Sequence, residues 1–133
     1  MQGTTREEGK EMTEHRLLKL ARRHLEAEYS GSVDATLDTL ADDIVYEHPF
    51  YQHMVSGKDK MRSYYLRRWA EAPLIRAETK RYWICGDDTI IMENGPFSDG
   101  PDRETTLIIL TFRGDELVRE LSYSPANLES HRG

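Results

Sequence analysis

Residues 105–124, TTLIILTFRGDELVRELSYS, contain two apolar runs separated by one Gly-Asp step. The run Thr105–Phe112 is the most apolar of the chain, which predicts a central strand. Gly114-Asp115 is typical of a tight hairpin, and Leu117–Ser124 predicts the last strand, which Pro125 ends. Because so short a turn forces antiparallel pairing, we expect this end of the chain to form an antiparallel sheet.

Upstream of this hairpin, runs of alternating apolar and polar residues predict three further strands. They cover Ile44–His48, Ile75–Cys85 and Thr89–Phe97. Pro49 ends the first of them, and turns are expected at residues 86–88 and 98–102.

The first half of the chain is predicted to be mainly helical. Thr13 can cap a first helix, which Ser30-Gly31-Ser32 ends, and Gly57 and Pro73 bound the last one. A short helix lies between them. The apolar positions at helical spacing are Leu17, Leu20, Ala21, His24 and Leu25, then Val33, Leu37 and Leu40, then Met61, Tyr65 and Trp69.

Together these elements predict one α+β domain over residues 13–128, with tails at 1–12 and 129–133. Long strands twist and curl, so three helices covering one face of the sheet are expected to enclose a conical pocket for a small apolar ligand.

Composition excludes several classes of protein. The 133 residues carry a net charge of −6, which disfavours a nucleic-acid partner. Cys85 is the sole cysteine, so neither an intrachain disulfide nor a cysteine metal site is expected. No apolar run is long enough for a membrane span or a signal peptide, which predicts a cytoplasmic protein. Since only 38% of the residues are hydrophobic, a dimer that buries one more apolar face is favoured.

The element order and several short motifs resemble the nuclear transport factor 2-like superfamily, and within it the SnoaL-like group. The matching positions are Ser30-Gly31, Val33-Asp34, Leu37, Leu40–Asp43, Ile44–Pro49, Gly57-Lys58, Met61-Arg62, Tyr64-Tyr65, Gly114-Asp115 and Tyr123. The resemblance implies a cone-shaped, curved antiparallel sheet, the α+β barrel, often as a homodimer packed through the sheet. It also implies a steroid-like or polyketide-like ligand, because the superfamily includes ketosteroid isomerase, scytalone dehydratase, limonene epoxide hydrolase and polyketide cyclases. Non-catalytic binding domains share the fold.

Two histidines are the candidate catalytic residues. His48 ends a strand just before Pro49, and the resemblance puts it where the isomerase keeps its general-base carboxylate. His24 lies on the apolar stripe of the first helix, where the isomerase has an oxyanion-binding tyrosine. The alternatives are a structural histidine at a strand end and a core histidine bonded to Tyr65 or to backbone.

At other positions where the relatives carry catalytic residues, this sequence has different residue types. Ile108 stands where the isomerase has a protonated carboxyl donor, and Glu120 and Ser122 stand where cyclases carry a histidine and an aspartate. Glu120 can act as an acid or base if it points inward, with Arg119 on the other face; otherwise it pairs with a cross-strand basic residue.

Further side chains are predicted to line the pocket. Its aromatic candidates are Tyr46, Tyr51, Tyr64, Tyr65, Trp69 and Trp83. Asn94, Ile108, Glu120 and Ser122 are the other candidate ligand contacts. No metal and no cofactor are expected, because strand alternation sends Glu47 and His48 to opposite faces and no spacing requires zinc.

Three functions follow from these patterns. The first is a cofactor-free acid/base enzyme with His48 as base and His24 as oxyanion partner or acid. The second is a non-catalytic ligand-binding or dimerisation domain, for which a sealed-in His24 is the expected sign. The third, a protein-partner adaptor, requires a large exposed apolar patch, of which a mean hydropathy of −0.72 gives no indication.

Overall fold

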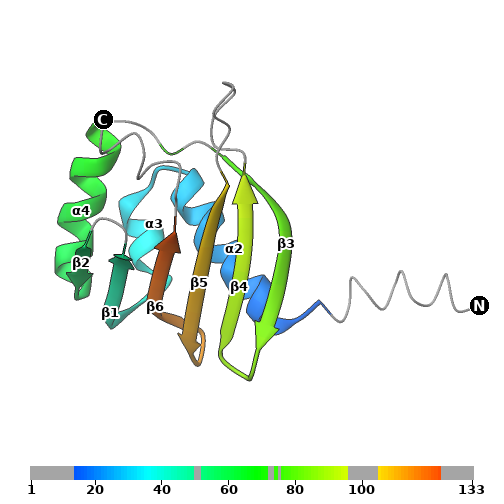
Figure 1. Ribbon diagram of the computed structural model, residues 1–133. Coiled ribbons are helices and arrows are strands. Elements are labelled where there is room, and N and C mark those ends of the chain that lie inside the picture. Colours follow the sequence, from blue (N-terminus) through cyan, green and yellow to red (C-terminus); the bar gives the residue numbers. More distant parts are fainter. Residues whose placement is uncertain (1–13, 50–51, 72–73, 75, 96–104, 124–133) are drawn as a thin grey trace, which may run out of the picture.

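The computed structural model describes residues 14–49, 52–71, 74, 76–95 and 105–123. Within them, three helices and six strands follow one another along the chain (Figure 1). The helices are α2 (Arg16–Tyr29), α3 (Val33–Leu37) and α4 (Lys58–Glu71). The strands are β1 (Leu40–His48), β2 (His53–Ser56), β3 (Glu78–Cys85), β4 (Thr89–Gly95), β5 (Thr106–Arg113) and β6 (Glu116–Tyr123).

Local signals explain where the elements begin and end. The N-cap of α2 is His15, whose Nδ1 accepts a hydrogen bond from the Leu17 amide at 3.0 Å. Ser32 caps α3 by accepting from the Ala35 amide. Between β5 and β6, Gly114 has a φ of 64°, a left-handed conformation that glycine adopts without steric cost. The predicted hairpin is therefore confirmed.

One curved sheet holds all six strands in the order β2-β1-β6-β5-β4-β3. The expectation of a wholly antiparallel sheet was wrong, because β1 and β6 pair in parallel, with Tyr46 opposite Glu120. No turn joins these two strands, so nothing forces them to run in opposite directions. The sheet also stays open, since β2 and β3 are its two edges in the described part of the chain.

The sequence patterns did not predict the beginning of β1 or any of β2. Leu40, expected on the second helix, belongs to β1 and pairs with Leu117. Asp42 and Asp43, which suggested a break, are exposed at an irregularity of β1, where the Asp43 carboxylate accepts a hydrogen bond from Arg113 at 2.8 Å. The four-residue strand β2 was not predicted at all. It pairs antiparallel with β1.

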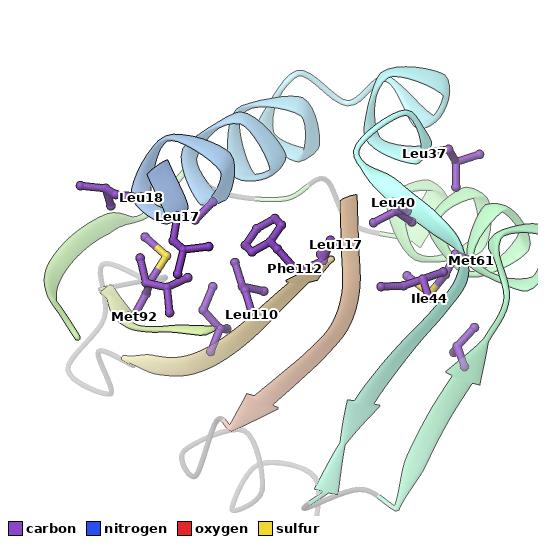
Figure 2. Packing of buried hydrophobic residues seen from close by; sticks show 14 of the residues in the cluster. Leu17, Leu18, Leu37, Leu40, Ile44, Met61, Met92, Leu110, Phe112 and Leu117 are labelled. Atoms are coloured by element: carbon purple, nitrogen blue, oxygen red, sulfur yellow. The ribbon is translucent and has the colours of Figure 1, made fainter. Parts of the chain in front are cut away.

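The helices cover one face of the sheet, and the core lies between the two layers (Figure 1). α2 packs against β4, and α4 packs against β1 and β2. Figure 2 shows Leu17 of α2 lying above Met92 and Leu110 of the sheet; each of these three side chains is fully buried. Met61 and Tyr65 are buried on α4, with Trp69 packed against the core, which confirms the predicted apolar stripe.

Several expectations fall outside the described residues. They are both tails, the Thr13 cap, the turn at 98–102 and the last two residues of the strand expected at 89–97. In the part that is described, no helix combines the length and the apolar character needed to cross a membrane.

We predict that truncating Met61 to alanine lowers the free energy of unfolding by about 2–5 kcal/mol, because Met61 is 1% exposed and its removal leaves a cavity. Leu66 of the same helix is 56% exposed, so Leu66→Ala is the matched control and should change stability by no more than about 0.5 kcal/mol. Urea denaturation followed by circular dichroism measures both. Equal losses would contradict this placement of the helix.

Candidate functional site

The inner face of the sheet carries a set of polar side chains among its apolar ones. Six of the predicted site residues lie there, five of them buried and Tyr46 partly so: Tyr46, His48, Asn94, Ile108, Glu120 and Ser122. The strand register explains this grouping. Ile108 lies opposite Ser122, and Glu120 lies opposite both Leu110 and Tyr46. Neighbours in one row of a sheet project to the same side, so the predicted residues share one wall of the core.

Glu120 points inward and is 7% exposed. The alternative, in which it pairs with a cross-strand basic residue, was wrong. Its neighbour Arg119 is exposed on the outer face, with its guanidinium 3.4 Å from the Glu47 carboxylate.

His24, fully buried on α2, lies between two carboxylates. Its Nε2 is 3.3 Å from Glu28 Oε2 and 3.5 Å from Glu120 Oε1. Neither contact meets hydrogen-bond geometry, so both are electrostatic contacts rather than hydrogen bonds. Glu28 follows His24 by one helical turn, which places both on the same side of α2. The helix and the sheet are thus joined by a buried charged cluster.

The other ring nitrogen of His24 also faces a protein group. Nδ1 lies 2.7 Å from Thr39 Oγ1, and the Thr39 hydroxyl donates to the Thr36 carbonyl at 2.6 Å. Because the hydroxyl proton is already used, Thr39 Oγ1 accepts from His24, and Nδ1 carries a hydrogen. Nε2 is therefore the nitrogen that is turned toward the carboxylates.

Charges this deep shift each other's proton affinities. Burial alone lowers the pKa of His24, but Glu28 and Glu120 outweigh it and raise that pKa to about 10. Burial raises the pKa of Glu120, with the Glu28 charge acting in the same direction and His24 opposing it. Apolar residues of similar volume would often make the core at least as stable as this charged cluster does. Buried groups with strongly shifted pKa values are typical of functional sites, so the cluster is a candidate site.

Aromatic side chains continue from this cluster toward β2. Tyr65 donates to Glu28 Oε2 at 3.2 Å and stacks on Trp69, with ring centroids 4.8 Å apart. Tyr64 lies 5.7 Å from Tyr65 and 5.3 Å from Tyr46, centroid to centroid. Burial is the main cause of a raised pKa in Tyr46, Tyr64 and Tyr65 alike, so each keeps its phenolic hydrogen at neutral pH.

His48 lies at the end of β1 and is 7% exposed. Burial lowers its pKa, and the nearby charges of His53 on β2 and Arg68 on α4 act in the same direction. A backbone hydrogen bond of His48 opposes them. The ring is therefore neutral at pH 7. His48 follows Tyr46 by two residues on the same face, which sets the two about 7 Å apart along the strand.

Sequence reasoning missed three members of this region. Glu28 had a usable signal, because it lies at i+4 from a histidine on an apolar stripe. No sequence pattern pointed to Thr39 or His53, because their place in the site depends on tertiary contacts. His53 contacts both Tyr64 and Tyr46, with ring centroids 5.6 and 6.3 Å apart.

Two other expectations about the lining need separate mention. Trp83 was wrongly expected in the pocket: it is 44% exposed on β3, where Arg81 lies over its ring. Tyr51 lies outside the described residues.

A groove of about 590 Å³ lies elsewhere, between α2 and the start of β3. The residues that line it are Arg22, Leu25, Glu26, Tyr29, Arg76, Ala77, Glu78 and Thr79, none of which was predicted as a site residue. Arg76 bonds Glu26 at 2.8 Å and lies over the Tyr29 ring, so its charge already has a partner there.

Comparison with known proteins agrees with this architecture. The model of the SnoaL-like domain family matches residues 21–120. The chain therefore belongs to the SnoaL-like domain family. No protein of curated function matches the sequence.

Three solved structures share the fold. An NTF-2 like protein of unknown function from Burkholderia xenovorans LB400 is 24% identical, with 85% of each chain covered and a TM-score of 0.67. A candidate ketosteroid isomerase from Kribbella flavida DSM 17836 is 18% identical over 80% of this chain and 76% of that one, with a TM-score of 0.66. A candidate polyketide cyclase from Sinorhizobium meliloti is 16% identical over 78% and 93%, with a TM-score of 0.67. At these identities the likeness establishes the fold alone.

We predict that the His48 C2 proton titrates in NMR spectra with a midpoint below 6.5, the ordinary histidine value. A lowered pKa means that the folded state resists protonation there, so the stability that His48 contributes is present above pH 6.5 and is lost as the pH falls through its folded pKa. In urea the midpoint should return to about 6.5. A folded midpoint at or above the unfolded one would contradict the burial of this ring.

Proposed function

We propose that this chain is an acid/base enzyme of the SnoaL-like type, acting on a small and largely apolar substrate that carries an oxygen function. The chemistry would be an isomerisation, dehydration, cyclisation or hydrolysis. The observation that carries the proposal is a neutral, buried His48 on the same strand face as Tyr46, next to a wall of aromatic rings.

His48 is the proton acceptor in this proposal. Its lowered pKa keeps Nδ1 or Nε2 without a proton at neutral pH, which a general base requires. The charges that act on its ring are those of His53 and Arg68, and both favour the neutral form.

Tyr46 is the hydrogen-bond donor to the substrate oxygen. Its pKa is raised by burial and then by Tyr64 and Glu120, so the hydroxyl stays protonated and can stabilise negative charge that develops on that oxygen. A donor about 7 Å along the strand from the base suits a substrate whose oxygen and reacting carbon lie a few bonds apart.

His24 takes a positioning role. The direct oxyanion contact expected from the sequence finds little support, because Nδ1 faces Thr39 and Nε2 faces the two carboxylates. In this proposal His24 instead holds the Glu120 carboxylate in place, and Glu120 is the cross-strand neighbour of Tyr46.

Aromatic rings define the substrate class. Tyr46, Tyr64, Tyr65 and Trp69 form consecutive ring contacts beside the polar groups. A flat apolar skeleton with one carbonyl or hydroxyl, as in polyketide-like or steroid-like compounds, fits this combination best.

Deuterium wash-in tests the proposal without knowledge of the natural substrate. Cyclohexanone and 2-decalone are incubated with the protein in D₂O, and loss of the α-proton signal is followed by NMR. We expect His48→Ala to slow exchange about 100-fold or more, which is the usual contribution of a general base.

His15 supplies the matched control. It is exposed at the N-cap of α2, and His15→Asn keeps a side chain that can cap the helix. This variant should exchange at the wild-type rate. Unchanged exchange in His48→Ala would remove His48 from the role of base.

The second candidate function is a non-catalytic ligand-binding domain, and the full burial of His24 favours it. The same experiment separates the two. If the wild type exchanges neither ketone above the background rate, the acid/base proposal fails and the binding domain stands.

We further propose that two copies associate through the outer face of the sheet. In the part of the chain that the structure describes, the helices lie on the inner face (Figure 1), and the outer face carries a cross-strand row of apolar side chains. The row is Trp83, Ile91, Ile109 and Leu121. A self-complementary apolar face of this kind suits a two-fold homodimer.

Light scattering coupled to size-exclusion chromatography tests this association. The wild type should elute as a dimer and Ile109→Glu as a folded monomer, because a charge in the middle of the row cannot be buried without a partner. Leu66→Glu, which puts the same charge on the exposed side of α4, should stay dimeric. A monomeric wild type would exclude the dimer.

A further inference from the structure

Three potential metal ligands converge at one point between α2 and β6. His24, Glu28 and Glu120 each offer one ligand atom there, and these atoms all lie within 4.8 Å of one another. We propose that these three residues bind a divalent metal ion of the zinc type. The proposal goes beyond the function proposed above, because it concerns an ion held behind Tyr46 rather than the base His48.

The distances are compatible with a metal site. A charge-assisted hydrogen bond from an imidazolium to a carboxylate spans about 2.7–2.9 Å. The His24 Nε2 contacts are longer, at 3.3 Å to Glu28 and 3.5 Å to Glu120, and neither has hydrogen-bond geometry. In a tetrahedral site with bonds of about 2.0–2.1 Å, neighbouring ligand atoms lie about 3.3–3.4 Å apart. The two His24 separations, 3.3 and 3.5 Å, are close to that edge, and all three ligand atoms lie within 4.8 Å of one another.

His24 is oriented as a ligand would be. Its Nδ1 donates to Thr39, whose hydroxyl in turn donates to the Thr36 carbonyl, so Nε2 is the nitrogen that faces the two carboxylate oxygens and is free to bind a metal once its proton is displaced. Nε2 and the two carboxylate oxygens need a cation between them, which is either the proton on His24 or a metal ion that replaces it. Metal-binding histidines are usually fixed in this way by a hydrogen bond at the other nitrogen.

Charge balance supports a divalent ion in particular. Two carboxylates and a neutral imidazole carry two negative charges, which one divalent cation cancels. A proton on His24 would cancel only one of them, in a place where His24 is 0% exposed and the Glu28 and Glu120 side chains are 13% and 10% exposed. Among the charged groups that act on Glu120 in the described part of the chain, none is a lysine or an arginine.

The donor set indicates the kind of metal and its use. One imidazole nitrogen and two carboxylate oxygens suit zinc or a similar first-row ion better than magnesium, which prefers oxygen ligands alone. Three protein ligands leave a coordination position for water or a substrate oxygen, as in catalytic zinc sites. Tyr65, which donates to Glu28, would hold that carboxylate in its binding orientation. The sequence suggested no metal because Glu120 lies far along the chain from the i, i+4 pair of His24 and Glu28.

Direct binding measurements test the site. The tag-free full chain is treated with chelator, then titrated calorimetrically with zinc chloride and, separately, with cobalt chloride. Because the site is buried, the metal is also added during refolding from urea. We expect one equivalent of zinc per chain, a zinc-dependent rise in melting temperature, and the visible absorption of four-coordinate cobalt.

Variants decide whether the bound metal is at this site. Glu28→Gln and Glu120→Gln keep the side-chain shape and remove one anionic ligand each, and we expect about 100-fold or weaker zinc binding from either. Glu26→Gln is the matched control, because Glu26 is an exposed carboxylate on the same helix. It should bind zinc as the wild type does. Circular dichroism confirms that each variant is folded.

The possible results are clearly separated. No zinc binding by the wild type, or equal binding by the wild type, Glu28→Gln and Glu120→Gln, overturns the proposal; the latter result means an adventitious ion only. His48→Ala should keep its zinc while losing proton exchange, so the metal site and the function of His48 can fail independently.

Discussion

Parallel pairing of β1 with β6 joins the two parts of the chain into one sheet. In the described part of the chain, β2 joins the sheet only through β1, and α4 packs against both of these strands. The pairing therefore fixes β1, β2 and α4 relative to β5 and β4, together with the hydrogen bond from Tyr65 to Glu28 on α2. The register of the pairing also sets Tyr46 beside Glu120, so the same contact that completes the sheet assembles the polar wall of the core.

The buried charged cluster lies where α2 meets this sheet. Leu17 and Ala21 on α2 pack as ordinary core residues, whereas His24 on the same stripe faces carboxylates. Ionised groups out of water cost several kcal/mol each unless they are compensated. The fold tolerates them because Thr39 orients the ring from one side and Tyr65 donates to Glu28 from the other. Apolar packing on both sides of the cluster supplies the stability that it lacks.

Local signals predicted the elements well and their partners less well. Periodicity located the stripe Met61, Tyr65 and Trp69, and the Gly-Asp step located the hairpin, because both are set by residues near each other in sequence. The strand β2 was missed because its four residues show little alternation and gain their order by pairing with β1. The parallel pairing was missed because register between distant strands leaves no trace in either one alone.

The candidate site shows the same division. The resemblance to the SnoaL-like group singled out the positions of His48, Glu120 and Ser122, and the structure buries all three. The sequence left open which face Glu120 takes. Trp83 was misplaced because an aromatic residue on a strand has the same pattern whether its face is covered by helices or not. Glu28 was overlooked because a carboxylate on a charged helix resembles many exposed ones until Glu120 is brought opposite to it.

The exposed edge of β3 has a consequence for how the molecule behaves in concentrated solution. An uncovered strand offers free backbone groups to any other chain, and this is a common start of aggregation. Here the strand carries Glu78, Lys80 and Arg81, all exposed, along its first half. Charged, strongly hydrated side chains at this border oppose the addition of a seventh strand. Addition of a strand to this edge is therefore discouraged, whereas stacking of two copies through the outer faces of their sheets is not.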